Sequence, residues 1–370
     1  MKELRHIKQK EKIRDTNLEL YRIVLMWFMV AHHYVVNSGL TDQNGVIFID
    51  LFSLKSISLL LLGAFGKTGI NCFLMITGYY MCKSNISVRK FVKLLAEVMF
   101  YRITIFIIFL VCGYEVISLR TILRVFIPVT QISTNFTGCF LCFFLFIPFI
   151  NLLINNINEK QHIYLLLLCG VVYVIIGTFQ RTTINYVEWF FVIYLIASYV
   201  RIYPKKVYSN INIWAIMMSL SIALLCLSVI SGGWIYSRTG KNLVYTFAVD
   251  SNSFLPVLIG ITSFMFFKNL KIKYNKLINT VAASTFGVLC IHTSSDAMRK
   301  WLWRDFLDNV GHYSLLHAII SVSFVFIICT IIDMIRIKLV EKPFLYFWDK
   351  QYPFFKKYIK KEDFCGSDSI

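Results

Sequence analysis

Ten apolar segments, each roughly as long as a membrane-crossing α-helix, limit what this chain can fold into. Charged residues occupy 16% of the 370 positions and hydrophobic residues 57%, whereas about a quarter of a soluble domain is charged. Backbone groups exposed to lipid must be hydrogen-bonded within their own segment, so helices are expected. The sequence predicts an all-α, polytopic bundle of about ten transmembrane helices near 18–37, 58–82, 91–113, 136–154, 162–179, 185–200, 211–231, 252–267, 277–293 and 314–337.

The basic residues predict how this bundle is oriented. If the N-terminus is inside, the inner segments carry 26 of the 38 Lys and Arg residues, the outer segments carry nine, and three fall within helices. Cytoplasmic loops are enriched in Lys and Arg. We therefore expect an even number of helices, with both termini in the cytoplasm. The same rule accounts for the net charge of +18, so no nucleic-acid partner is predicted.

This pattern of apolar and basic segments divides the chain into three parts. Residues 1–16 form a basic cytoplasmic segment, residues 17–343 form the transmembrane domain, and residues 344–370 form a basic cytoplasmic tail suited to anionic lipid. Cys139 and Cys142 form a CxxC pair within an apolar helix that has no other ligands nearby, so no metal site is predicted.

The first apolar segment carries four ionisable side chains, which are costly at membrane depth and often functional. Glu19 and Arg22 lie near its inner end, and His32 and His33 lie further along. Eleven helical steps bring His33 to within about 20° of the Arg22 face and about 16 Å along the axis, whereas His32 lies about 100° away from His33. Histidine suits general-base chemistry, so His33 is the catalytic candidate. The alternative is that Arg22 snorkels to the interface while the histidines pack.

The second apolar segment contains Gly66, Gly69 and Gly78 together with Lys67 and Asn71. Small residues let transmembrane helices approach closely, which explains the glycines. Close packing does not explain Lys67 and Asn71. The segment is therefore expected to be broken or closely packed and to line a polar cavity.

Two further groups stand near the ends of helices. Arg89, Lys90 and Lys93 follow the second segment on the inner side and could hold phosphate groups, although the positive-inside rule also predicts basic residues there. His292 ends the run 286–292 near the outer level of His33. It is a further candidate, with packing or capping as the alternative role.

Taken together, these residues resemble the membrane-integral acyltransferase family three, which includes bacterial O-acetyltransferases of lipopolysaccharide, capsule and other exopolysaccharides. The first helix matches the family's pattern of Arg, ten residues and His. The second resembles its signature, with Asn71 where Asp is common and Thr77 where Ser is common. The resemblance spans residues 17–343 and includes Gly78-Tyr79, the pair Lys90 and Lys93, Ser284 to His292, and Glu341-Lys342-Pro343.

The resemblance implies an O-acyltransferase of the bacterial cytoplasmic membrane. It would transfer an acyl group, most simply acetyl from acetyl-CoA, to a hydroxyl of a cell-envelope glycan that is lipid-linked or nascent, alongside polysaccharide biosynthesis proteins. His33 would act as base or acyl carrier. The CoA phosphates would lie on Arg22, Arg89, Lys90 and Lys93, and the supporting residues would be Glu19, His32, Lys67, Asn71, Tyr79 and His292.

The alternative is a transporter or exporter in which the same polar residues line a substrate path, since broken helices suit that class too. The sequence shows no inverted repeat, and its inner Arg22 aligns with the deeper His33. Both features favour the acyltransferase.

Overall fold

The computed structural model describes residues 14–41, 53–84, 86–132, 135–180, 182–241, 243–248 and 250–356. These residues form helices and loops, with no β-strand among them, and each of the ten predicted apolar segments is helical. The all-α architecture is thus confirmed. Most of the predicted basic segment 1–16 and the end of the tail 344–370 lie outside the described residues.

The longer helices are α1 (Thr16–Val36), α2 (Leu54–Ala64), α3 (Gly66–Met81), α4 (Val88–Val111), α6 (Phe136–Asn155), α7 (Glu159–Cys169), α9 (Tyr186–Ile202), α10 (Ile211–Thr239), α11 (Phe254–Asn269), α16 (Leu315–Arg336) and α17 (Lys342–Lys356). The shorter ones are α5 (Leu119–Phe126), α8 (Gly177–Phe179), α12 (Lys276–Ala283), α13 (Thr285–His292), α14 (Asp296–Lys300) and α15 (Asn309–His312). Short 3₁₀-helical and π-helical stretches join several of these: η1 (Pro128–Gln131), η2 (Gly170–Ile176), η3 (Lys206–Ser209), η4 (Trp301–Phe306) and η5 (Ile337–Glu341).

Six helical stretches in the described chain are long and apolar enough to cross a membrane, and one bent pair would make a seventh. Helices α1 and α9 do not qualify, and α11 is apolar but has only 16 residues. The total of about ten spans and the cytoplasmic location of both ends therefore stay predictions. A helix that is surrounded by other helices does not meet lipid, so α1 can carry polar residues that a peripheral span cannot.

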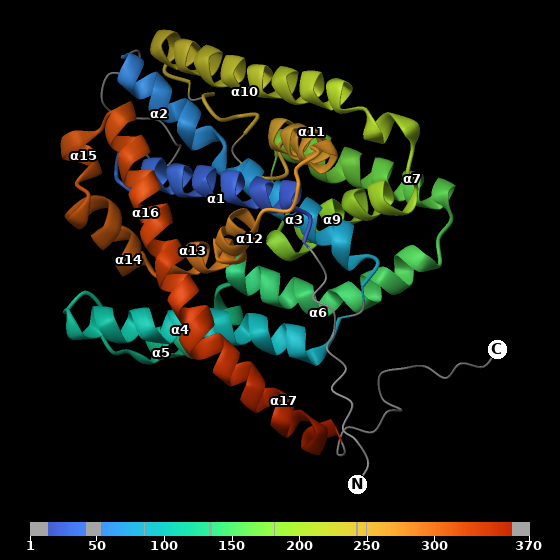
Figure 1. Cartoon of the computed structure of the whole chain (residues 1–370). Helices are drawn as coiled ribbons and strands as arrows, with labels where there is room; N and C mark the ends of the chain where they lie inside the picture. The colour runs from blue at the N-terminus through green and yellow to red at the C-terminus, as the bar shows by residue number, and fades with distance from the viewer. Residues whose placement is uncertain are drawn as a thin grey trace.

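Helix α1 runs through the middle of the bundle and packs against α2, α3, α11, α12, α13 and α16 (Figure 1). Glycines permit its closest contact. A Cβ atom on Gly66 would lie 1.9 Å from Cγ of His32, and one on Gly69 would lie 2.7 Å from Cγ of Met29. The predicted close packing of the second segment is confirmed, and it brings Lys67 beside the histidines.

Helices α12 and α13 enter the bundle and stop inside it. The chain then bends by 96° into α14 and η4. Ser295 caps α14 by accepting a hydrogen bond from the Met298 amide. As a result, His292 at the end of α13 is held in the interior and is fully buried.

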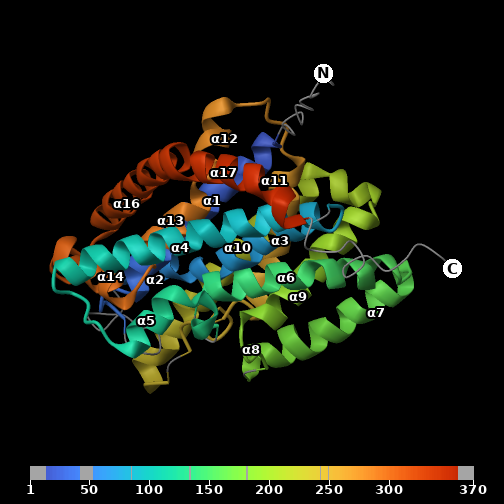
Figure 2. The same ribbon diagram turned by 90° about the horizontal axis from the view of Figure 1, so that it is seen from below.

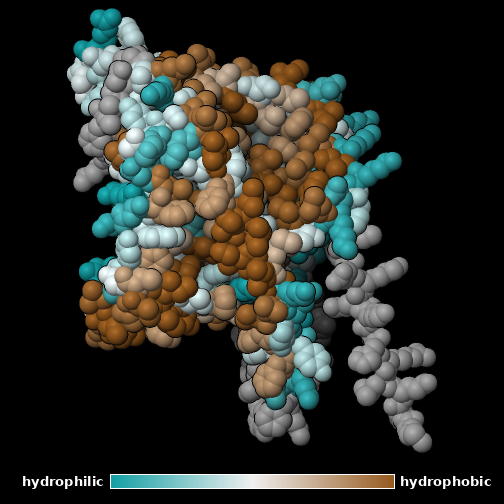
Figure 3. All heavy atoms as spheres, turned by 60° about the vertical axis from the view of Figure 1, so that its left-hand side comes forward, coloured by the Kyte–Doolittle hydropathy of each residue, from teal (hydrophilic) through white to brown (hydrophobic). Residues whose placement is uncertain are grey.

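The outer surface of the bundle suits lipid. Long apolar helices such as α10 and α16 leave many large side chains exposed, among them Ile216, Leu227, Ile320 and Ile331. Figure 3 shows a broad hydrophobic zone on one face, with hydrophilic residues toward its left and right margins. A multi-pass membrane protein is the class that this surface indicates.

Helix α17 continues the last apolar helix through η5 and extends away from the bundle (Figure 1). This region was predicted to be the start of a tail, with no helix. Helix α5, which lies along α4 on the face seen in Figure 2, was not predicted either. Both are short amphipathic elements that a search for twenty-residue apolar segments passes over.

Candidate active site

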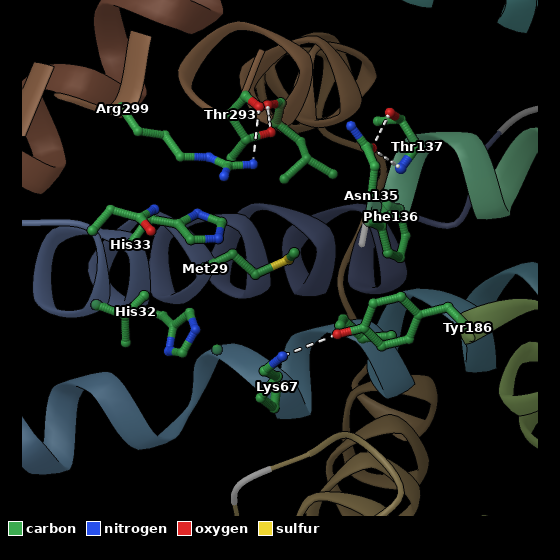
Figure 4. Close-up of a pocket in the computed structure, with 15 residues that line it drawn as sticks. Met29, His32, His33, Lys67, Asn135, Phe136, Thr137, Tyr186, Thr293 and Arg299 are labelled. Carbon is green, nitrogen blue, oxygen red and sulfur yellow. Dashed lines mark hydrogen bonds between the residues drawn. The ribbon is translucent and has the colours of Figure 1, made fainter. Parts of the chain in front are cut away.

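A cavity of about 230 Å³ lies beside the C-terminal half of α1. Its walls come from α1, α3, the beginnings of α6 and α9, and the turn between α13 and α14. Figure 4 shows His32 and His33 on one side of this space, Lys67 and Tyr186 below, and Arg299 and Thr293 above. The predicted polar cavity therefore exists, and both histidines line it.

His33 is hydrogen-bonded to His292, with 2.9 Å between Nδ1 of His33 and Nε2 of His292. Nδ1 of His292 lies 2.6 Å from the Val288 carbonyl oxygen, and a carbonyl can only accept, so this nitrogen carries the proton. In neutral rings, Nε2 of His292 must then accept a proton from Nδ1 of His33. This leaves Nε2 of His33 with its lone pair, which is the form that a general base needs.

Both neighbouring histidines of α1 line the cavity, although consecutive residues of a helix point about 100° apart. His32 and His33 have ring centroids 5.4 Å apart, and both line the cavity. The reason is that the cavity spans more of the α1 surface than the 100° between consecutive residues. His32 is fixed differently, because its Nδ1 lies 2.6 Å from the carbonyl oxygen of Gly63 and must donate to it.

Two cations complete the cavity. Lys67 donates to the hydroxyl of Tyr186 over 3.0 Å and lies 3.9 Å from Oδ1 of Asp250. Arg299 is 2.9 Å from Oδ1 of Asp296. Its Nε is buried and has no hydrogen-bond partner among the described residues. Both side chains are placed where a developing negative charge on oxygen could be stabilised.

Asn71 does not line this cavity. Its Nδ2 donates to the carbonyl of Ser251 over 2.7 Å, and its Oδ1 accepts from Nε1 of Trp189 over 2.9 Å. The side chain is fully buried. Asn71 therefore joins α3 to α9 and to the loop before α11, and an amide serves this role because it both donates and accepts.

The predicted donor-binding residues at the opposite end of α1 lie close to carboxylates. Nη1 of Arg22 is 3.9 Å from Oε1 of Glu19, while Glu19 also lies 3.6 Å from Arg14. Nε of Arg22 is buried without a hydrogen-bond partner in the described chain. Tyr79 accepts a hydrogen bond from Arg201 over 2.8 Å and lies below its guanidinium.

Two residues of the predicted basic cluster on α4 are engaged within the chain. Arg89 makes two hydrogen bonds to Asp349 of α17, at 2.7 and 2.9 Å. Lys93 lies 2.6 Å from Oε1 of Glu341 in η5. These pairs attach α17 and η5 to α4, which is a structural role that the sequence did not reveal because the partners are about 250 residues apart.

The structure also shows functional candidates that were not predicted from the sequence. Arg299 in α14, Thr293 after α13 and Tyr186 at the start of α9 line the cavity. Arg299 is one of the nine basic residues of the predicted outer segments. Since basic residues are rare on the outer side, their clustering at 299–304 was a signal that could have been followed.

One comparison with known proteins found a match. A family model described as an acyltransferase domain, that of acyltransferase family 3, matches residues 15–334. Neither a curated protein nor a solved structure matches the chain. The matched range contains α1 with both histidines, the cavity, and α13 with His292. The chain therefore belongs to acyltransferase family 3 and is a membrane acyltransferase.

Proposed function

We propose that this protein transfers an acetyl group from acetyl-CoA to a hydroxyl of a cell-envelope glycan in the bacterial cytoplasmic membrane. The observation that carries the proposal is the hydrogen bond from His33 to His292, which leaves Nε2 of His33 unprotonated beside a polar cavity. Family membership supports acyl transfer. The acetyl group, the CoA donor and the glycan acceptor are part of the proposal.

In the direct mechanism, Nε2 of His33 removes the proton from the acceptor hydroxyl. The oxygen attacks the thioester carbonyl carbon, and the resulting oxyanion is stabilised by Arg299 or Lys67, which line the same space. The carbon–sulfur bond then breaks, and the thiolate takes the proton from His33. The products are an ester and free CoA, so atoms and charges balance.

In the relay mechanism, Nε2 of His33 attacks the thioester itself and CoA leaves as the thiolate. The acceptor hydroxyl then attacks the acyl-imidazole, loses its proton to the departing thiolate or to water, and regenerates His33. Both mechanisms need the same lone pair on Nε2, and therefore the same contact with His292.

The donor would bind with its phosphates at the end of the bundle where α1 begins. The proposed set is Arg22, Arg89, Lys90 and Lys93. The carboxylate contact of Arg22, at 3.9 Å, is longer than those of Arg89 and Lys93, and Arg22 lies on the same face of α1 as His33. Met26 and Met29, both buried, occupy that face between them. Because Met side chains are flexible, we propose that the pantetheine arm reaches His33 by displacing them.

Replacing Arg22 with Ala should mainly weaken donor binding. A charge-assisted contact to phosphate contributes about 1.5–3 kcal/mol, so we expect KM for acetyl-CoA to rise about tenfold to a hundredfold, with kcat much less affected. The measurement is initial rate against acetyl-CoA concentration in membranes with matched protein levels. An unchanged KM would remove Arg22 from the donor site.

The function itself is tested by the fate of a labelled acyl group. Membranes that contain the protein, incubated with acetyl-labelled acetyl-CoA, should transfer the label to alkali-labile esters on glycan, and membranes without the protein should not. Movement of glycan or of a small molecule across the membrane, with no ester formed, would instead favour the transport hypothesis.

The proposed orientation is tested by cysteine labelling. A cysteine at Lys241 should react with a membrane-impermeant maleimide added outside intact cells, while one at Lys205 should react only after permeabilisation. Cys112 is exposed near the outer end of α4, so the background should carry Cys112→Ser. Outside labelling at position 205 would contradict the topology and the route proposed for the donor.

A further inference from the structure

A second cavity, of about 630 Å³, lies next to the first and is almost three times as large. It is enclosed by the end of α4, by α5 and by α14. Asn135 and Arg299 line both cavities, so the two spaces adjoin at these residues. A molecule bound in the larger cavity would therefore reach toward His33.

The larger cavity has an excess of positive charge. It is lined by four cations, Arg102, Arg124, Arg299 and Lys300, and by two carboxylates, Glu115 and Asp296. Arg299 forms an ion pair there, and its partner Asp296 is 86% exposed. Neither the Arg124 guanidinium nor the Lys300 ammonium has a carboxylate partner in the described chain.

A buried cation elsewhere in the chain behaves in the opposite way. Arg336 at the end of α16 lies within about 3 Å of Glu97, Asp333 and Glu341, so its charge is fully compensated inside the protein. Cations held only for structure are normally paired in this way. The presence of Arg124 and Lys300 without carboxylate partners also runs against the scarcity of Lys and Arg residues expected on the outer side. Both contrasts indicate that an external anion completes the cavity.

A hydrogen bond between α4 and α5 holds one wall of this cavity in place. Nη1 of Arg102, which is only 7% exposed, donates to the backbone carbonyl of Arg124 over 2.8 Å. This bond holds α5 over the end of α4. Helix α5 exposes Leu119, Ile122, Leu123 and Phe126 on its other side, so it suits the membrane surface. The cavity thus opens where an acceptor attached to lipid would lie.

We infer that the cavity between α4, α5 and α14 binds the acceptor through an anionic group, either a sugar carboxylate or a phosphate near the acylated sugar. This inference rests on the proposed function and names its substrate class. Arg124 and Lys300 bind the anion at the outer part. Arg299, whose buried Nε lacks a partner in the described chain, contacts it at the junction with the His33 cavity.

The inference is tested by binding, with no need for turnover. The protein in nanodiscs of zwitterionic lipid is titrated with three fluorescent disaccharides that differ in one group: one carries a glucuronate carboxylate, one a phosphate and one a neutral hydroxyl. An anionic probe should bind at least about tenfold more tightly than the neutral one, and its affinity should fall as salt is added. The anionic probe that binds more tightly shows whether the site prefers a carboxylate or a phosphate.

Substitutions in the wall of the larger cavity test whether the anion binds there. Each of the substitutions Arg124→Gln and Lys300→Gln should weaken binding of the anionic probe about tenfold, the size expected for loss of one charge-assisted contact. Binding of the neutral probe should not change. Arg120→Gln is the matched control, because Arg120 is on the same short helix, is exposed and does not line the cavity. Lys300 is exposed, so its variant should fold even if the Arg124 variant does not.

Three results would overturn the inference. The first is equal binding of neutral and anionic probes, and the second is an equal loss in the Arg120 variant. The third is displacement of the probe by phosphatidylglycerol in the nanodiscs, which would make the cavity a lipid headgroup site. Failure of the proposed function is distinguishable, because it appears as absent acyl transfer from acetyl-CoA while probe binding persists.

Discussion

Cells that express His33→Ala should lose glycan O-acylation almost completely while the protein remains folded in the membrane. A general base contributes about 10²–10⁴-fold to rate, and loss of an acyl carrier is at least as severe. His33 lines the cavity and is the residue whose Nε2 is left free by His292. The measurement is O-acyl content of the glycan at matched membrane levels of each variant.

Two neighbouring variants make this result specific. His32→Ala should reduce activity less, because His32 contributes a hydrogen bond to Gly63 and part of the cavity wall. His292→Ala should lower kcat with little change in KM for acetyl-CoA. His292→Gln should recover part of the loss, since its side-chain oxygen can still accept from Nδ1 of His33. His292 is therefore a positioning residue.

The opposite pattern would be informative. Full activity in the His33 variant would remove it from the catalytic step. Loss only in the His32 variant would transfer the chemistry to the side of the cavity that holds Lys67. If both His292 variants lowered kcat and raised KM for acetyl-CoA to the same extent, the result would indicate a general packing defect.

Arg336→Ala should strongly destabilise the protein. The Arg336 side chain is 4% exposed and lies 3.1 Å from Glu97, 2.8 Å from Asp333 and 3.0 Å from Glu341. Without it, three carboxylates remain with Lys93 as the nearby cation, which lies 2.6 Å from Glu341. Removal of one partner from a buried ion pair costs about 3–5 kcal/mol because the remaining charge is uncompensated.

Thermal unfolding in detergent, followed by fluorescence-detected chromatography, measures this effect. Arg238→Ala is the matched control, because Arg238 is exposed and its one described contact is with the Trp234 ring, 6.0 Å away. Arg336→Ala combined with Glu97→Gln should be more stable than Arg336→Ala alone, since one unpaired charge is removed. A melting temperature for Arg336→Ala equal to that of the control would show that the cluster does not stabilise the bundle.

The charged cluster of Arg336, Glu97, Asp333 and Glu341 also contacts the helix that carries His292. A Cβ atom on Gly287 would lie 2.1 Å from Oδ1 of Asp333, so the cluster packs directly against α13, which carries His292. Tyr101 donates to the same carboxylate oxygen over 2.7 Å. Stability and the position of His292 are therefore coupled through Asp333.

Local patterns were enough to predict the class of fold and the residues of α1. Apolar segments of membrane-spanning length predict helices because lipid leaves the backbone no other partner. A helical period also fixes how Arg22 and His33 lie on one helix. The same reasoning gave His292 as a candidate, but it could not show that His292 contacts His33 across 259 positions.

Only the tertiary structure decided which polar residues meet. Asn71 resembles a site residue in sequence, yet its side chain is bonded to Ser251 and Trp189. Arg89 and Lys93 were predicted to bind a donor, and they pair with Asp349 and Glu341. Arg299 was not among the predicted site residues, and it lines both cavities. The sequence by itself determined a membrane bundle whose first helix carries polar residues, because those features depend on local hydrophobicity and helical spacing. The pairing of buried charges and the walls of the cavities depend on contacts between helices far apart in the chain, which only packing in three dimensions specifies.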